Sequence, residues 1–101
     1  MARSRLELQA KLKEMAPKVW YRRPPDNRMT YPCIIYRYGR PEVWRANNQA
    51  YQIFDSYNVI YITQEPDEAI VHRMLTEFRH CSFDREYESD NLYHYSFTLF
   101  Y

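Results

Sequence analysis

Glycine is almost absent from this sequence, because Gly39 is the only one among 101 residues. The glycine-rich loops that bind phosphate groups or dinucleotides need several glycines at fixed spacing, so both kinds of site are excluded. Flexible linkers rich in glycine and serine are excluded for the same reason. The length is that of one small domain, and we expect a single domain over residues 1–101.

Cysteine is also scarce. Cys33 and Cys81 are far apart and neither belongs to a CxxC pair. Each lies in a strand-like apolar stretch, which is typical of reduced core thiols in a reducing compartment. His80 adjoins Cys81, but neighbouring side chains of a strand point to opposite faces, and a zinc site needs about four ligands. We therefore expect no metal and no cofactor.

Long apolar segments are missing as well. No run approaches the roughly 20 residues that span a bilayer, and the first residues contain no apolar core of a signal peptide. We therefore expect a soluble protein that is made in the cytoplasm and has no membrane partner.

Aromatic residues, by contrast, are abundant, with 11 Tyr, 5 Phe and 2 Trp. This aromatic area is sufficient for a core at this length and excludes a disordered chain.

The net charge of +1 hides an uneven distribution. Residues 1–50 contain 11 Lys and Arg against 4 Asp and Glu, whereas residues 51–101 contain 3 against 9. The two halves therefore have charges of +7 and −6. If folding keeps them apart, the molecule has two poles that suit stacking on copies of itself or on charged partners.

Two segments have helical patterns. Residues 4–15 begin with a capping box, Ser4 to Glu7, continue with an apolar stripe and end before Pro17. A second helix is expected to begin after Asp67 as its N-cap. The apolar positions Ile70, Met74 and Phe78 form its buried stripe.

Strands are expected in the remaining segments, with residues 39–50 as the least regular part. Asn47-Asn48 and Asp90-Asn91 are turn signals. The expected strands are residues 19–21, 33–38, 51–63, 81–88 and 93–101, and Val43-Trp44-Arg45 has a weaker strand-like pattern. Residues 59–62 are apolar at every position, which indicates a central strand that is covered on both faces.

The expected fold is therefore α+β, with element order α-β-β-β-α-β-β. Short connections favour a mostly antiparallel sheet of four to five strands with two helices packed on one face. The loops expected at residues 22–30 and 39–50 are long for so small a domain, and long loops are often functional.

Arginine and aromatic residues are concentrated in these two loops. Such a mixture is enriched at protein–protein interfaces and also suits nucleic acid. The residues that we assign to an assembly interface are Arg22, Arg23, Pro25, Arg28, Trp44 and Arg45. The carboxylate pairs are explained as a helix start and a solvated strand face, so we assign no catalytic residue.

Several segments, in this order and spacing, resemble one family of proteins. They are WYRRPP (Trp20 to Pro25), MTYPCIIY (Met29 to Tyr36), PDEAI (Pro66 to Ile70), CSFDR (Cys81 to Arg85) and SDNLYHY (Ser89 to Tyr95). The set is similar to small tail terminator or tail completion (head–tail joining) proteins of long-tailed bacteriophages. The resemblance extends from Leu6 to Tyr101.

The resemblance implies a structural role without catalysis. Such proteins form a ring, usually a hexamer, on the head-proximal end of the tail tube, where they stop tube polymerisation and meet the head connector. The implied partners are other copies of the chain, the tail tube protein and the head connector, and DNA passes through the lumen as cargo. The implied location is the host cytoplasm during assembly and then the virion.

Two alternatives from other classes stay open. Compact α+β toxins also end in an aromatic strand, so a toxin-like ribonuclease that uses His94 or Arg85 is one hypothesis. A small nucleic-acid-binding protein without catalysis is the other. It predicts binding that falls steeply with salt, although the near-zero net charge disfavours it.

Overall fold

The computed structural model of the protein describes residues 4–22, 30–46 and 49–101. The elements, in chain order, are α1 (Arg5–Lys13), β1 (Lys18–Tyr21), β2 (Cys33–Ala46), β3 (Gln49–Thr63), α2 (Ala69–Glu77), β4 (Cys81–Ser89) and β5 (Leu92–Phe100). The α+β class and the order α-β-β-β-α-β-β are confirmed. Neither α1 nor α2, the helices of these residues, is long and apolar enough to cross a membrane.

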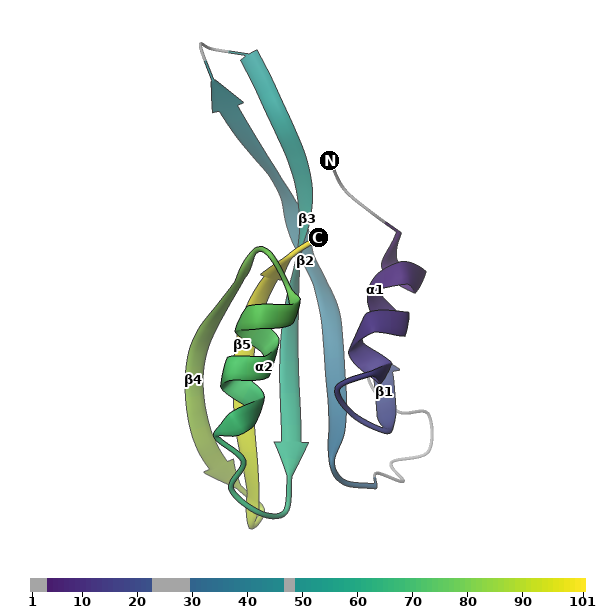
Figure 1. The fold of residues 1–101 in the computed structure, drawn as a ribbon, viewed down its shortest axis with the longest axis vertical. Helices are drawn as coiled ribbons and strands as arrows, with labels where there is room; N and C mark the ends of the chain where they lie inside the picture. The colour runs from purple at the N-terminus through teal and green to yellow at the C-terminus, as the bar shows by residue number, and fades with distance from the viewer. Residues whose placement is uncertain (1–3, 23–29, 47–48) are drawn as a thin grey trace.

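The five strands form one sheet in the order β1-β2-β3-β5-β4. β1 is parallel to β2, and the other neighbours are antiparallel. Both helices lie on the same face of this sheet (Figure 1). β3 is central, as its apolar run predicts, but the helices cover only one of its faces. On the opposite face Ile62 is buried and Ile60 is half-buried.

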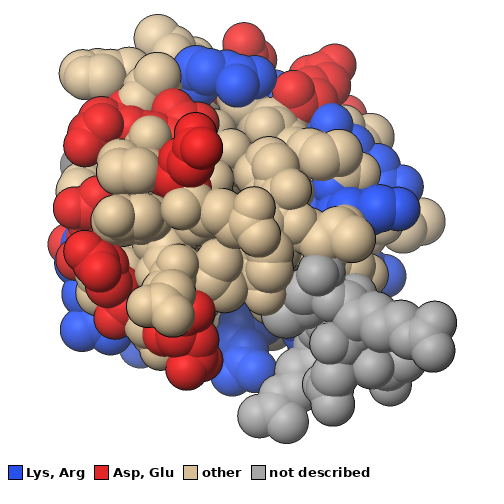
Figure 2. Space-filling model, turned by 90° about the horizontal axis from the view of Figure 1, so that it is seen from below, with Lys and Arg blue, Asp and Glu red and all other residues tan. Residues whose placement is uncertain are grey.

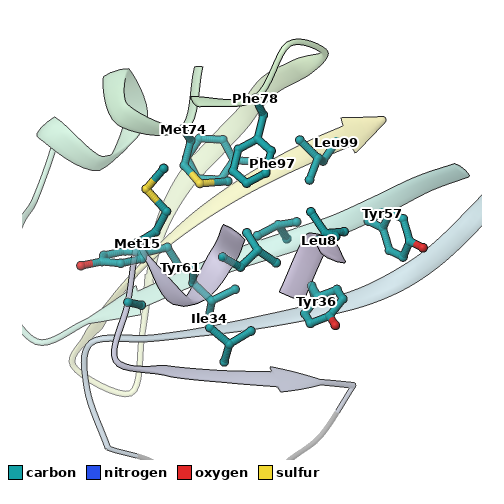
Figure 3. Close-up of a cluster of buried hydrophobic side chains, with 14 of the residues drawn as sticks. Leu8, Met15, Ile34, Tyr36, Tyr57, Tyr61, Met74, Phe78, Phe97 and Leu99 are labelled. Carbon is teal, nitrogen blue, oxygen red and sulfur yellow. The ribbon is translucent and has the colours of Figure 1, made fainter. Parts of the chain in front are cut away.

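The core lies between the helices and the sheet (Figure 3). Alternate residues at the start of β2, at the end of β3 and along β5 point into it, and α1 and α2 contribute the residues of their apolar stripes. Tyr36, Phe97 and Met74 are among its fully buried side chains. Burying one such side chain contributes about 1.5–3 kcal/mol, so this layer supplies most of the stability of the domain.

Both helix starts differ in detail from the expectation. Ser4 caps α1, but its hydroxyl accepts from the amide of Leu6 at 3.2 Å rather than from that of Glu7. The prediction that Asp67 caps α2 is wrong, because Glu68 is the N-cap and makes no capping bond with its side chain.

Asp67 serves the buried tyrosines instead. Its amide donates to the Tyr95 hydroxyl at 2.9 Å, and its carboxylate accepts from the Tyr61 hydroxyl at 3.4 Å. Burial, with the Asp67 carboxylate as a second cause, raises the pKa of Tyr61 to about 12. Asp67 therefore satisfies the hydroxyls of Tyr61 and Tyr95, which need hydrogen-bond partners in the interior, instead of capping α2.

The two hairpin predictions have different outcomes. Asp90 and Asn91 both have positive φ, 54° and 61°, as the predicted two-residue turn between β4 and β5 requires. The prediction of an irregular loop over residues 39–50 is wrong. β2 continues to Ala46 and β3 begins at Gln49, so Val43, Trp44 and Arg45 are extended. The Asn47-Asn48 turn lies outside the described residues.

Candidate assembly surfaces

The outer halves of β2 and β3 form a two-stranded arm, here defined as residues 40–46 and 49–55. It projects beyond the five-stranded body (Figure 1), and the molecule measures 48 × 27 × 21 Å. The pairing of the arm runs from Pro41 opposite Asp55 to Ala46 opposite Gln49. A projecting ribbon of this kind is well placed to contact another chain.

A bulge joins the arm to the body. The register of β2 and β3 shifts between Tyr38 and Pro41. Here Gly39 packs directly on β3, where a Cβ at Gly39 would lie 2.6 Å from the Ser56 hydroxyl oxygen. That hydroxyl accepts from the amide of Arg40 and donates to its carbonyl, both at 2.9 Å. The single glycine of the chain is therefore explained by a close approach of two strands, which is a common use of glycine at bulges.

An aromatic cluster fixes one face of the arm. The Trp44 ring lies 4.6 Å from the ring of Phe54, 4.9 Å from that of His80 and 6.0 Å from that of Phe100, measured between ring centroids. Phe54 is buried, and Trp44 is half-buried. Trp44, which the sequence assigns to an interface, therefore has an internal packing role at the base of the arm.

The other face of the arm is apolar and open to solvent. Val43 and Ile53 lie directly opposite each other in the β2–β3 register, and their exposed fractions are 40% and 47%. Two β-branched side chains at paired positions form a small continuous apolar surface. This pair is a stronger candidate for a contact than Trp44, and the sequence analysis did not select it.

The arginines of the predicted interface are only partly described. Arg22 is exposed at the end of β1, has φ of 70°, and its guanidinium lies 5.3 Å from the ring centroid of Tyr21. Arg45 is exposed on the arm. The remaining predicted residues, Arg23, Pro25 and Arg28, lie outside the described residues. Arg22 and Arg45 are on different parts of the molecule, so the structure does not join them into one patch.

The charge asymmetry of the sequence survives folding. The strand order is β1-β2-β3-β5-β4. One lateral half of the domain therefore contains α1, β1 and β2, and the other contains α2, β5 and β4. Figure 2, which shows one face of the molecule, has most of its acidic atoms on the side of β4 and a group of basic atoms on the opposite side, with some basic atoms also beside the acidic ones. The two poles that the sequence suggests are therefore present on the surface.

The residues proposed for a ribonuclease do meet on the open face of the sheet. Tyr87 and His94 are paired across β4 and β5, and their rings are stacked at 4.7 Å. The Arg85 guanidinium lies 4.9 Å from the centroid of the same Tyr87 ring. Packing between neighbours on one sheet face explains these contacts.

The thiols are poor nucleophiles at neutral pH. Both cysteines are free, and burial raises the pKa of Cys33 and of Cys81 to about 11. At neutral pH they are therefore protonated, whereas reactive cysteines are thiolates. Within residues 4–22, 30–46 and 49–101, no three His, Cys, Asp or Glu side chains are grouped closely enough to hold a metal ion.

The acidic strand β4 lies at an outer edge of the sheet, a position that the sequence does not indicate. Its glutamates have the alternating pattern of any solvated strand, and only the strand order reveals that they line an outer edge of the sheet.

Comparisons with protein-family models, curated protein sequences and solved structures gave no match.

Proposed function

We propose that the protein is a structural virion protein, a tail terminator or tail completion protein. In this role it forms a ring at the head-proximal end of a phage tail tube, stops tube polymerisation and joins the tail to the head connector. The ordered motifs described above support this role. The structural observation that carries the proposal is the projecting arm with its exposed Val43–Ile53 pair.

The arm needs a partner on physical grounds. A two-stranded ribbon in water is marginally stable by itself. One face of this ribbon is held by the Trp44–Phe54 contact, whereas the other exposes its apolar pair. A protein surface that covers Val43 and Ile53 would stabilise the arm and remove its apolar area from water. An assembly subunit provides such a surface in its neighbours or in the tail tube.

The buried polar groups and the thiols of the body also suit a structural role. The Tyr61 and Tyr95 hydroxyls fix the start of α2, because one donates to the Asp67 carboxylate and the other accepts from the Asp67 amide. The thiols are protonated because of their raised pKa. A non-catalytic subunit needs no other chemistry from these residues.

Polymerisation of the tail tube tests the proposal. Tail tube protein from the encoding phage is polymerised with and without this protein, and tube lengths are measured in negative-stain images. We expect capped tubes with densities at one end and no growth after its addition. In the phage, loss of the gene should give overlong tails that do not join heads. Unchanged tube lengths together with normal virions from the deletion would overturn the proposal.

One observation favours the ribonuclease alternative, namely the meeting of His94 and Arg85 around Tyr87. It predicts RNA cleavage that His94→Ala abolishes. A preparation that leaves RNA intact, and whose expression does not arrest growth, would exclude it.

A further inference from the structure

The two outer edges of the sheet differ in charge and are both accessible. The chain up to the end of β2 contains all the residues that give the first half its charge of +7, and the rest has −6. One edge of the sheet is β1, beside α1, and the other is β4, beside α2. Surfaces of opposite charge on opposite sides of one molecule are complementary to each other in a second copy.

The basic edge consists of Leu6, Lys13, Lys18 and Arg22, all of which are exposed. Among the residues whose burial the structure describes, Leu6 has the largest exposed fraction of the large apolar side chains, 67%. Leu6 and Lys13 are seven residues apart in α1, so they lie on one face of that helix. Lys18 and Arg22 lie at the two ends of β1, the outermost strand. This edge is therefore an exposed leucine surrounded by cations.

The acidic edge consists of Leu75, Phe83, Glu86 and Glu88, which are also exposed. Phe83, 39% exposed, and the two glutamates are on β4. Leu75 is on α2, about 200° around the helix from Arg73. Because the Arg73 guanidinium donates to the Glu14 carbonyl of α1, Leu75 faces the β4 side. This edge is therefore an apolar pair beside two carboxylates.

The two edges also match in height along the strands. Lys18 lies in one row of the sheet with Tyr87, which is flanked by Glu86 and Glu88. That row is Lys18, Cys33, Ile62, His94 and Tyr87.

Leu6 and Phe83 are matched in the same way. Phe83 lies in one row with Tyr21, which is made of Tyr21, Tyr36, Val59, Phe97 and Phe83. Arg5, the neighbour of Leu6, lies over the Tyr21 ring at 4.3 Å and donates to the Tyr36 hydroxyl at 3.2 Å. Leu6 is therefore near the height of Phe83, as Lys18 is near that of the glutamates.

We propose that the acidic edge of one copy binds the basic edge of a second copy, head to tail. Leu6 of one copy contacts Phe83 and Leu75 of the next, and Lys13 pairs with Glu86 and Glu88. Copies in a closed ring are at equal height, so the matching rows suit ring closure by a heterologous contact. The inference rests on the ring proposed above and specifies which surfaces form it.

Each edge also contains a few charges of the other sign. Glu7 and Glu14 are exposed on α1, and Arg85 is exposed on β4. Arg85 is directed at the Tyr87 ring, and Tyr87 shares the open sheet face with His94. Glu86 is paired with the core residue Tyr95, so it lies on the helix-covered face, away from Arg85. Lys13 of α1 therefore meets the glutamates on the side of the helices, whereas Lys18, in the row of Ile62 and Tyr87, lies on the open face and adds to the positive charge of its edge.

Charge exchange between the edges tests this contact on the purified chain. E86K/E88K gives a molecule with two basic edges, and K13E/K18E gives one with two acidic edges. Sedimentation of each at about 0.5 mM and low salt should show self-association roughly ten-fold weaker or more, because attraction becomes repulsion. A 1:1 mixture, and the chain with all four changes, should regain association. E65K/E77K, with the same charge change away from the edges, should associate as the wild type does.

Zero-length carbodiimide coupling, which joins an amine to a carboxylate in contact, gives a second measurement. Isotope-mixed samples should yield links between chains from Lys13 to Glu86 or Glu88. A wild-type chain that stays monomeric under these conditions, or a mixture that associates no better than its components, would overturn the edge contact. If the edge contact fails but the protein still caps tubes, the proposed function remains supported. Restored pairing without any effect on tubes would instead support the contact and count against the terminator role.

Discussion

The five-stranded body and the two-stranded arm are made from the same strands, β2 and β3, but different contacts hold them. In the body, Tyr36 and Val59 are paired and fully buried beneath the helices. In the arm, the paired Val43 and Ile53 are exposed, and the opposite face is held by a single aromatic cluster. Strand pairing continues through both regions, so the difference is whether helices bury one face of the strands. The helices of the chain cover the body, whereas the Val43–Ile53 face of the arm is exposed in the single chain.

The bulge marks the boundary between these regions. Gly39 and Ser56 are in contact where the body ends, and beyond them two strands continue without helices above them. The one glycine thus lies where the helix-covered body ends and the two-stranded arm begins.

The largest effect is expected from the body. Phe97→Ala removes a fully buried ring and should lower the free energy of unfolding by about 3–5 kcal/mol. The control is Phe83→Ala on the neighbouring strand, whose ring is 5.5 Å away but 39% exposed, and its loss should be clearly smaller. Urea unfolding followed by circular dichroism measures both. Equal losses would contradict the assignment of the core.

The boundary should be the next most sensitive place. Gly39→Ala puts a Cβ against the Ser56 hydroxyl, which its bonds to Arg40 hold in place, and overpacking of this kind costs about 1–3 kcal/mol. Ser56→Ala loses those bonds but removes the obstructing oxygen. The double variant should therefore be less destabilised than the sum of the two single changes. Additive losses in urea unfolding would show that the close approach is not the reason for the glycine.

A smaller and more local effect is expected within the arm. Trp44→Ala removes the centre of a half-buried cluster and should cost about 1–2 kcal/mol, less than a fully buried aromatic ring. Amide hydrogen exchange should accelerate in residues 41–46 and 49–55 and stay unchanged in the body. Trp20→Ala, half-buried on β1, is the control that should leave the arm unaffected. Faster exchange throughout the sheet would place Trp44 in the main core.

The smallest effect on stability is expected from the exposed pair. Val43→Ser with Ile53→Ser should change the free energy of unfolding by less than about 0.5 kcal/mol, because neither side chain is buried in the single chain. The same variant should cap tail tubes poorly. Normal capping by this variant would remove the arm from the assembly surface, and a large loss of stability would show that its face is covered within the chain.

Much of the fold follows from local patterns. Alternation places Tyr95, Phe97 and Leu99 on one face of β5, and the Asp90-Asn91 turn fixes the last hairpin. The second strand of the arm is expected from residue 51 onward, but the continuation of β2 through residues 39–46 is missed. Gly39 and Pro41 are residues that usually end a strand, and the exposed Val43 does not continue the pattern of the core. The prediction of a cap at Asp67 fails because Tyr61 and Tyr95, distant in sequence, need its polar atoms.

The candidate surfaces depend still more on tertiary structure. Loop composition selects Trp44, but only the packed structure shows its ring against Phe54. The sequence contains the opposing charges, but the strand order decides that they lie at opposite edges. Lys18 and Tyr87, which is flanked by Glu86 and Glu88, are brought into one row of the sheet by strands far apart along the chain.

We propose above that this chain associates with copies of itself in a closed ring. Native mass spectrometry of the wild-type protein at low and high salt, alone and on tail tubes, tests this claim most directly. The account predicts one closed oligomer, with a hexamer at about 75 kDa, six times the 12.5 kDa chain, that weakens as salt screens the charged edges. A species of 12.5 kDa under every one of these conditions would contradict it.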